Sequence, residues 1–285
     1  MQVSSRCDRL SPKILPDHQP SNLRILLVED NPTNQKLTLK QLQSLGHTAD
    51  IVGNGYAAVT TIAHSRYDLV LMDCHLPLID GFTATLAIRD RESQNTAPCS
   101  KRIIVIAMTA SDSRQDRERA IAVGMDDYLL KPVRRETLAT LLNHWSQIIA
   151  AADLPASDAP PRVSPELASA RDFNSLSLHL DFEYLHQISD DCPDFEIELL
   201  QIFLEDSFLH LEELRQAIAT HNVREAEQIA HHIKGASANV GAQIVRSAVE
   251  QLEEQARQGK FGAIDDLLTK IEFSLSQIQQ FTHNF

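Results

Sequence analysis

Acidic side chains follow short apolar runs in the first half of the chain, and this pattern limits what the chain can fold into. Asp73 ends one such run, and Glu29 and Asp30 follow another. Thr109 and Lys131 follow two more. Each run is a strand candidate, and helical stretches separate the runs. Five β-α units in series predict a parallel sheet covered by helices on both faces.

The expected elements are short and alternate along the chain. The strand candidates are Leu23–Glu29, Thr48–Val52, Leu69–Asp73, Ile103–Met108 and Tyr128–Leu130. The helical stretches are Thr33–Leu45, Tyr56–Ser65, Phe82–Arg91, Ser113–Val123 and Arg134–Ile149. Open α/β folds keep their binding sites at the edge where the carboxyl ends of parallel strands meet. We therefore expect the acids, Thr109 and Lys131 to meet there.

The pattern changes after about residue 150, and the chain is long enough for two domains. We divide it into a flexible tail (1–21), an α/β domain (22–148), a linker (149–174) and an all-α domain (175–285). The expected helices of the last part are Asp181–Ile188, Asp194–Ala219, Val223–Asn239, Ala242–Gln258 and Phe261–Phe281. Short connections between long helices predict an antiparallel bundle. The linker has an r.m.s. span of ~28 Å, so contact between the two domains of one chain is feasible.

Charge and composition exclude some classes of function. The net charge is −13, and residues 175–285 hold 7 Lys and Arg against 19 Asp and Glu. An acidic second half without a basic stripe argues against nucleic-acid binding. No apolar run approaches the length of a membrane span, and the first 22 residues do not resemble a signal peptide. The four cysteines lack metal-ligand spacing, which favours reduced thiols and a cytoplasmic protein.

The expected cluster suits Mg²⁺ and phosphoryl transfer. Asp30 and Asp73 could bind the ion directly, with Glu29 acting through water. The cation would screen charge repulsion while Asp73 attacks a phosphoryl phosphorus. Lys131 would pair with the phosphoryl oxygens, and the Thr109 hydroxyl would donate a hydrogen bond to one of them.

This set of motifs resembles the receiver domain of two-component response regulators over residues 22–148. The matching motifs are Val28-Glu29-Asp30-Asn31, Asp73 with Pro77 and Asp80-Gly81, Ile106-Ala107-Met108-Thr109-Ala110, Gly124-Met125-Asp126-Asp127-Tyr128 and Lys131-Pro132. The resemblance implies a flavodoxin-like, doubly wound, five-stranded parallel sheet. It identifies Asp73 as the phosphoacceptor and Glu29 and Asp30 as the Mg²⁺ acids.

The same resemblance implies three further roles. The backbone carbonyl of His75 would be another Mg²⁺ ligand. Thr109 and Tyr128 match the switch pair, in which the hydroxyl moves toward the phosphoryl group and the aromatic ring rotates inward. Lys131 would precede a cis peptide bond to Pro132.

Two other interpretations of this region remain open. The run Gly53-Asn-Gly55-Tyr-Ala-Ala58 fits a loose dinucleotide-binding fingerprint, and Asp73 lies 20 residues after Gly53. That interpretation leaves Glu29, Thr109 and Lys131 without roles. An aspartate phosphatase is the other candidate, but it commonly has a general acid two residues after its nucleophile, where this chain has His75. A stable acyl phosphate is therefore the expectation.

A second group of reactive residues lies on a predicted helix of the bundle. Ala226, Ile229, Ala230, Ile233, Ser237 and Val240 follow helical spacing and define its buried side. A helix turns ~100° per residue, so His231 lies about 160° from Ile233 on the solvent side. Lys234 lies about 60° from His231, close enough to share a phosphoryl group, and His232 is expected at the flank. Gly235 would let a partner approach closely.

The run Ala230-His231-His232-Ile233-Lys234-Gly235 resembles the signature of the histidine phosphotransfer (HPt) domain, over about residues 175–285. Ser237, Asn239 and Gly241 continue the family pattern. The resemblance implies that His231 is a phosphoacceptor. Without these neighbours, adjacent histidines would be an ordinary polar helix surface.

A receiver joined to an HPt domain resembles the C-terminal part of a hybrid histidine kinase and predicts a phosphorelay intermediate. The sequence holds no P-loop or ATP-binding kinase domain, so a separate sensor histidine kinase would supply the phosphoryl group to Asp73. Asp73 phosphorylation would be Mg²⁺-dependent and promoted by the receiver itself, and His231 would pass the group to a downstream response regulator. Two alternatives are a phosphate sink and a phosphorylation-switched binding module with the bundle as a docking surface. We expect no nucleic-acid partner and no membrane insertion.

Overall fold

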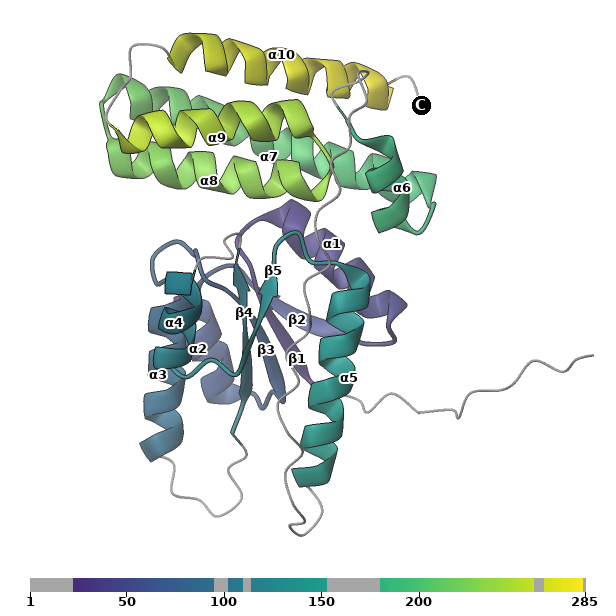
Figure 1. The fold of residues 1–285 in the computed structure, drawn as a ribbon, viewed down its shortest axis with the longest axis vertical. Coiled ribbons are helices and arrows are strands. Elements are labelled where there is room, and N and C mark those ends of the chain that lie inside the picture. The colour runs from purple at the N-terminus through teal and green to yellow at the C-terminus, as the bar shows by residue number, and fades with distance from the viewer. Residues whose placement is uncertain (1–22, 95–101, 110–113, 153–179, 259–263, 284–285) are drawn as a thin grey trace, which may run out of the picture.

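The computed structural model describes residues 23–94, 102–109, 114–152, 180–258 and 264–283. It contains an α/β part, which we call the sheet domain (23–152), and an all-helical part, which we call the helical bundle (180–283). The bundle lies across the carboxyl edge of the sheet (Figure 1). The predicted tail (1–21) and residues 153–174 of the predicted linker lie outside the described residues.

Five parallel strands form the sheet in the order β2-β1-β3-β4-β5. They are β1 (Ile25–Val28), β2 (Ala49–Val52), β3 (Leu69–Asp73), β4 (Ile104–Thr109) and β5 (Asp127–Leu130). Alternate side chains enter opposite cores: Leu26 and Val28 contribute to one, Ile25 and Leu27 to the other. Such continuous apolar strands are needed where a parallel sheet is buried on both faces. The predicted doubly wound sheet is confirmed.

Helices cover the two faces of the sheet unequally (Figure 1). On one face lie α1 (Pro32–Ser44) and α5 (Arg135–Ala152). On the other lie α2 (Gly55–His64), α3 (Gly81–Gln94) and α4 (Arg114–Ala122). Asn31 caps α1, because its Oδ1 accepts a hydrogen bond from the Asn34 N–H at 3.0 Å. The helix α5 continues beyond its predicted end at Ile149, into the first residues assigned to the linker.

The helical bundle consists of α6 (Phe182–Ser189), α7 (Pro193–Ala219), α8 (Val223–Asn239), α9 (Gln243–Arg257) and α10 (Ile264–His283). Apolar residues of α6 to α10 form one core, which Leu37 of α1 also enters. Three-residue turns, at 220–222 and 240–242, reverse the chain between α7, α8 and α9. Gly241 has a φ of +73° in the second turn, a conformation that glycine adopts without strain. The predicted bundle is therefore present, with short connections where they were expected.

Two expectations from composition can be compared with the structure. Cys74 and Cys192 are free thiols, whereas Cys7 and Cys99 lie outside the described residues. Within the described part of the chain, no helix combines the length and apolar character that crossing a membrane requires.

The helix α1 of the sheet domain packs against α7 and α8 of the bundle. Leu37 is its apolar contact, because it is only 2% exposed and lies in the core of the bundle. The ammonium of Lys36 lies 2.6 Å from Glu198 Oε1, and that of Lys40 lies 5.2 Å from the centre of the Phe195 ring. A buried leucine flanked by two lysines thus fits α1 onto an acidic and aromatic surface.

A glycine and an asparagine on α8 lie beside α1 at the domain interface. Asn239 Nδ2 donates a hydrogen bond to Asn34 Oδ1 at 2.5 Å, and both residues are buried. A Cβ atom on Gly235 would lie 3.8 Å from Asn34 Nδ2, which is ordinary van der Waals distance. Alanine would therefore fit at this position. The partner that approaches Gly235 is therefore the sheet domain of the same chain.

We expect Leu37→Ala to separate the two domains. Truncating a buried leucine typically costs about 2–5 kcal/mol, and here that loss falls on the domain interface. The radius of gyration from small-angle X-ray scattering should increase. The matched control is Leu86→Ala on α3, where the side chain is exposed, and it should leave the scattering unchanged. Equal radii for Leu37→Ala and wild type would contradict this account of the interface.

Candidate functional site

Three carboxylates meet at the carboxyl edge of the sheet. Glu29 and Asp30 follow β1, Asp73 ends β3, and these two strands are neighbours. One carboxylate oxygen from each residue lies within 4.8 Å of the others. Glu29 and Asp73 are buried, whereas Asp30 is half-buried. The predicted meeting of the acids is confirmed.

Lys131, directly after β5, neutralises part of this negative charge. Its Nζ lies 2.5 Å from Glu29 Oε2 and 2.6 Å from Asp73 Oδ2. Burial disfavours the ammonium, but the two carboxylates outweigh it and raise the pKa of Lys131. Burial also raises the pKa of Glu29 to about 7, against the opposing effect of Lys131. The peptide bond from Lys131 to Pro132 is cis, as the resemblance implied.

A divalent cation fits this set of donors. When Glu29 is ionised, three carboxylates and one ammonium leave the cluster negative, and oxygen ligands suit a hard cation such as Mg²⁺. Glu29 accepts from Lys131 and, at 2.8 Å, from Asn34 Nδ2, so both of its oxygens have partners. That agrees with an indirect role for Glu29 through water. The His75 N–H donates to Asp73 Oδ1 at 3.0 Å, which orients the loop whose carbonyl is the further predicted ligand.

The predicted switch residues lie beside this cluster. Thr109 is buried at the end of β4, and its carbonyl accepts a hydrogen bond from the Lys131 N–H at 2.7 Å. Tyr128 is half-buried on β5, paired in register with Ala107. The guanidinium of Arg117 lies 4.3 Å from the centre of the Tyr128 ring. Their switching role stays a prediction.

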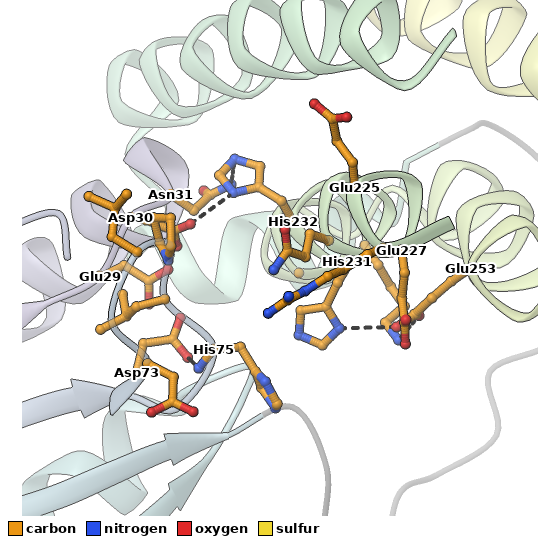
Figure 2. Close-up of a pocket in the computed structure, with 18 of the residues that line it drawn as sticks. Glu29, Asp30, Asn31, Asp73, His75, Glu225, Glu227, His231, His232 and Glu253 are labelled. Atoms are coloured by element: carbon orange, nitrogen blue, oxygen red, sulfur yellow. Dashed lines mark hydrogen bonds and ion pairs between the residues drawn. The ribbon is translucent and has the colours of Figure 1, made fainter. Parts of the chain in front are cut away.

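His231 of α8 lies opposite the acid cluster across the domain interface (Figure 2). Its side chain is 30% exposed. Its ring centre lies 4.9 Å from that of His75, in an edge-to-face arrangement. The side of α8 that carries His231 is the outside of the bundle, as predicted, but in the whole chain it faces the sheet domain.

One cavity of about 1260 Å³ contains both groups of reactive residues. Its walls come from the loops after β1, β3 and β5 and from α8 and α9 (Figure 2). The reactive side chains that line it are those of Glu29, Asp30, Asp73, Lys131, His231 and Lys234. The two groups of reactive residues found in the sequence therefore form a single site.

Glu253 of α9 is a site residue that the sequence analysis missed. Its Oε1 lies 3.2 Å from His231 Nδ1, and its other oxygen accepts a hydrogen bond from Lys234. Burial would raise the pKa of Glu253, but these hydrogen bonds and nearby positive charge hold it at about 2. An ionised carboxylate only accepts, so Nδ1 of His231 carries the proton. In the neutral ring, the lone pair is then on Nε2 of His231.

A sequence signal for Glu253 existed. Val245, Val249 and Glu253 are spaced four residues apart on the buried side of α9. An acid that continues an apolar stripe must find a partner when it is buried. That spacing would have predicted a buried carboxylate in need of a basic or hydrogen-bonding group.

His232 is more deeply placed than the predicted flank position. Its side chain is 12% exposed, with Nε2 2.9 Å from Asp206 Oδ2 and Nδ1 3.4 Å from Asp30 Oδ2. Burial would lower its pKa, but the hydrogen bonds to these two carboxylates raise the pKa of His232 to about 9. The residue therefore belongs to the domain interface and touches one of the predicted Mg²⁺ acids.

The fingerprint-like run at residues 53–58 has a structural explanation. A Cβ on Gly55 would lie 2.4 Å from the carbonyl oxygen of Ile79, so close packing between α2 and the loop after β3 requires glycine there. The run follows β2, an edge strand, and β1 separates β2 from the strand that carries Asp73. Asp73 therefore does not occupy the position of a ribose-binding acid in that interpretation.

Two family models match the chain. The model of the response regulator receiver domain matches residues 25–143, and that of the Hpt domain matches residues 198–281. The sensor protein GacS of Pseudomonas syringae pv. syringae is 30% identical over 82% of this chain and 25% of that protein. The hybrid signal transduction histidine kinase B of Dictyostelium discoideum is 42% identical over 39% of this chain and 6% of that protein. The chain thus spans a quarter or less of the length of these relatives.

Among solved structures, one similar chain is the receiver domain of sensor histidine kinase PA1611 from Pseudomonas aeruginosa PAO1, with a magnesium ion coordinated in the active site cleft. It is 42% identical, with a TM-score of 0.39, and covers 44% of this chain and 98% of that chain. Another is from the co-crystal structure of the Saccharomyces cerevisiae phosphotransfer protein Ypd1 and the receiver domain of Ssk1. It is 32% identical, with a TM-score of 0.44, and covers 47% of this chain and 94% of that chain.

Glu253 should make the folded state sensitive to acid. The pKa of Glu253 is about 2 in the folded chain, below the ordinary value of 4.5. Its stabilising contribution is therefore complete above about pH 5 and is lost as the pH falls toward 2. We expect Glu253→Gln to lower the free energy of unfolding near pH 7, and the difference from wild type to shrink in acid. Urea unfolding across this range measures it.

The matched control for that experiment is Glu254→Gln, because the Glu254 carboxylate lies on the same helix but is exposed. It should change the free energy of unfolding little at any pH. A Glu253→Gln difference that does not depend on pH would contradict the ion pairs assigned to this residue.

Proposed function

Because the chain joins a response regulator receiver domain to an Hpt domain, we propose that it is a phosphorelay intermediate in which both phosphoacceptors serve one cavity. Asp73 accepts a phosphoryl group from the phosphohistidine of a sensor histidine kinase. His231 takes the group from Asp73 and passes it to the aspartate of a downstream response regulator. The two domains together resemble the phosphorelay modules of hybrid kinases.

In the first step, a carboxylate oxygen of Asp73 attacks the phosphorus of the donor phosphohistidine. The new P–O bond forms as the P–N bond breaks, and the donor imidazole leaves. Lys131 lies 2.6 Å from Asp73 Oδ2 and would pair with the phosphoryl oxygens, while the Thr109 hydroxyl would donate to one of them. Mg²⁺ held by Asp30, Asp73 and the His75 carbonyl, with Glu29 through water, would neutralise charge on the transferred group.

In the second step, Nε2 of His231 attacks the phosphorus of the acyl phosphate. The P–N bond forms as the P–O bond to Asp73 breaks, which returns the carboxylate. The Nδ1 proton stays on the imidazole and is held by Glu253. Positive charge that develops on the ring is stabilised by that carboxylate. Lys234 lies on the same helix and would pair with the phosphoryl oxygens.

The observation that carries this proposal is the shared cavity. Asp73 and His231 both line it, and the ring of His75 lies 4.9 Å from that of His231 while the His75 N–H binds Asp73 Oδ1. Holding two reacting groups at one site makes transfer between them effectively unimolecular. The docked domains therefore favour transfer within one chain over transfer between chains.

We expect acetyl phosphate and Mg²⁺ to label both Asp73 and His231 of the full chain. Acid stability, base stability and peptide mass distinguish an acyl phosphate from a phosphohistidine. Asp73→Asn should abolish both labels, because the group reaches His231 through Asp73. His231→Gln should keep the Asp73 label and abolish transfer to a downstream receiver.

His283→Gln is the control, because it removes a histidine at the exposed end of α10. Its labelling should match wild type. If Asp73 alone is labelled in wild type and its phosphate is lost to water, the chain acts as a phosphate sink. If His231 is never labelled but Asp73 phosphorylation recruits a partner, the bundle acts as a docking surface.

We expect Glu253→Gln to slow the second step. Removing the carboxylate behind a metal-bound histidine typically costs about 10- to 100-fold in activity, and we expect a similar loss here because Glu253 likewise fixes the tautomer of a histidine. Rapid-quench measurement of Asp73-to-His231 transfer should show that loss, whereas the rate of Asp73 labelling should remain that of wild type. Glu254→Gln should transfer normally. An unchanged transfer rate in Glu253→Gln would remove Glu253 from the mechanism.

Cytoplasmic location and the Thr109–Tyr128 switch stay predictions from the sequence. The predicted domain limits of 22–148 and 175–285 also stay predictions.

A further inference from the structure

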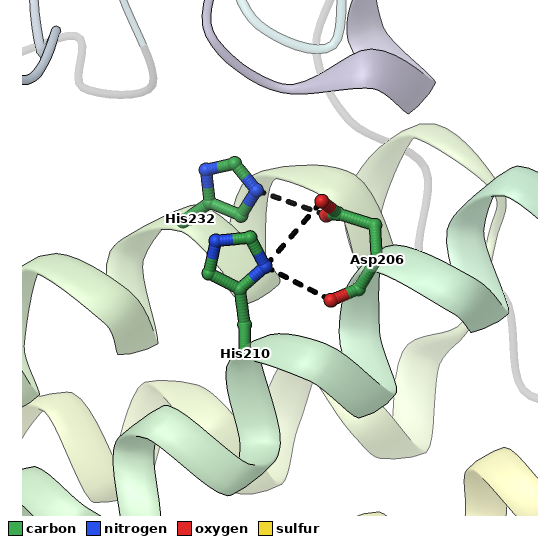
Figure 3. A group of neighbouring side chains, drawn as sticks. All are labelled: Asp206, His210 and His232. Atoms are coloured by element: carbon green, nitrogen blue, oxygen red, sulfur yellow. Dashed lines mark hydrogen bonds and ion pairs between the residues drawn. The ribbon is translucent and has the colours of Figure 1, made fainter.

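His232 crosses the domain interface with a carboxylate on either side. Its Nδ1 lies 3.4 Å from Asp30 Oδ2 of the receiver, and its Nε2 lies 2.9 Å from Asp206 Oδ2 of α7. The ring of His210 stacks on it at a centroid distance of 4.1 Å. Figure 3 shows Asp206 next to both histidines. His232 thus links the bundle directly to an acid assigned above to Mg²⁺.

Both ring nitrogens of His232 act as donors in this arrangement. A carboxylate only accepts, so a ring placed between two carboxylates is an imidazolium with a charge of +1. Asn31 Nδ2 also donates a hydrogen bond to Asp206 Oδ2 at 3.3 Å, so this carboxylate accepts from the sheet domain as well. Opposite charges are therefore paired at a part-buried interface, where loss of one partner leaves the other uncompensated.

These side chains do not form a separate metal site. Asp206, His210 and His232 offer possible ligand atoms within 4.8 Å of one another. The two imidazole rings are stacked with only 26° between their planes, so their lone pairs cannot converge on one ion as metal ligands must. His210 Nδ1 also lies 2.9 Å from the backbone oxygen of Asp206, which requires a proton on that nitrogen.

The net charge of the acid cluster sets how strongly His232 is attracted across the interface. When ionised, Glu29, Asp30, Asp73 and Lys131 sum to −2. Mg²⁺ would bring this sum to zero. A phosphoryl group on Asp73 in addition would bring it to about −1. The attraction for the imidazolium is therefore strongest without metal, weakest with Mg²⁺ alone, and partly restored by phosphorylation.

We propose that the HPt domain uses His232, held by Asp206, to distinguish the phosphorylated receiver from the unphosphorylated, Mg²⁺-bound one. The distinction arises because the His232 imidazolium and Mg²⁺ compete for Asp30. Mg²⁺ on the unphosphorylated receiver weakens docking, and docking weakens Mg²⁺ binding by the same factor. The phosphorylated receiver is docked in preference to the unphosphorylated, Mg²⁺-bound one. This inference rests on the proposed Mg²⁺ acids and is independent of phosphoryl transfer to His231.

The preference fits the order of events in a relay. The phosphorylated receiver holds His231 against Asp73 while the phosphoryl group moves. Once Asp73 is again a carboxylate beside Mg²⁺, the attraction for His232 falls and the domains separate. The surface around His231 is then free for the receiver domain of a downstream regulator, which would otherwise have to displace α1.

Calorimetric titration of Mg²⁺ into the unphosphorylated full chain tests the competition. We expect His232→Gln, which removes the charge and keeps a hydrogen-bonding side chain, to bind Mg²⁺ about fivefold or more tightly than wild type. The control His283→Gln should bind like wild type. Equal affinities in His232→Gln and wild type would overturn the inference. If no variant binds Mg²⁺, the assignment of the acids falls and the inference with it.

Small-angle X-ray scattering of the same chains tests the effect on docking. Wild type should be compact in EDTA, larger in Mg²⁺, and compact again in Mg²⁺ with beryllium fluoride as the phosphoryl mimic. His232→Gln should lose the difference between EDTA and Mg²⁺, and Leu37→Ala provides the separated reference. A wild-type radius of gyration that Mg²⁺ does not change would overturn the inference. Neither experiment involves phosphoryl transfer, so a failure of the relay would be seen separately in the labelling of His231.

Discussion

The packing of α1 into the bundle, centred on Leu37, brings the two reactive groups of this chain together. Leu37 extends from the sheet domain into an apolar core built mainly by the helices of the bundle, and a hydrogen bond from Asn239 to Asn34 joins α8 to α1. Because Asp30 and Asn31 precede α1 directly, the same contact sets the acid cluster against His232 and orients His231 toward Asp73. Without this packing, each half would hold its own reactive residue and the linker alone would govern their encounters.

The negative charge concentrated at one edge of the sheet is the second constraint on how the two domains dock. Parallel strands bring Glu29, Asp30 and Asp73 together, and Lys131 neutralises only part of their charge. Residues 175–285 carry a large excess of acids, and the bundle wall of the cavity carries both signs of charge. Its basic residues include His232, Lys234 and Arg257, and its acids are Glu225, Glu227 and Glu253. The bundle therefore meets the acid cluster through one residue, His232, which Asp206 holds from behind.

Much of the fold follows from patterns that neighbouring residues impose. Continuous apolar runs specify strands buried on both faces, and the order of motifs located Asp73, Lys131 and Thr109 at strand ends. Helical spacing identified Ala226, Ala230 and Ile233 as the buried side of α8, which is correct, and thereby put His231 outside the bundle. Glu253 was missed, although its spacing from Val245 and Val249 indicated burial. His232 was judged from its own helix alone, and the partner that buries it lies in the other domain.

Local periodicity and the parallel order of strands are enough to predict the two domain types, the strand-end acids and the helix that carries His231. The shared cavity, the contact of Glu253 with His231 and the contact of His232 with Asp30 are visible only in the folded chain, because they join residues far apart in the sequence. Helical spacing can mark Glu253 as buried, but the group that pairs with a buried charge depends on which surfaces come together.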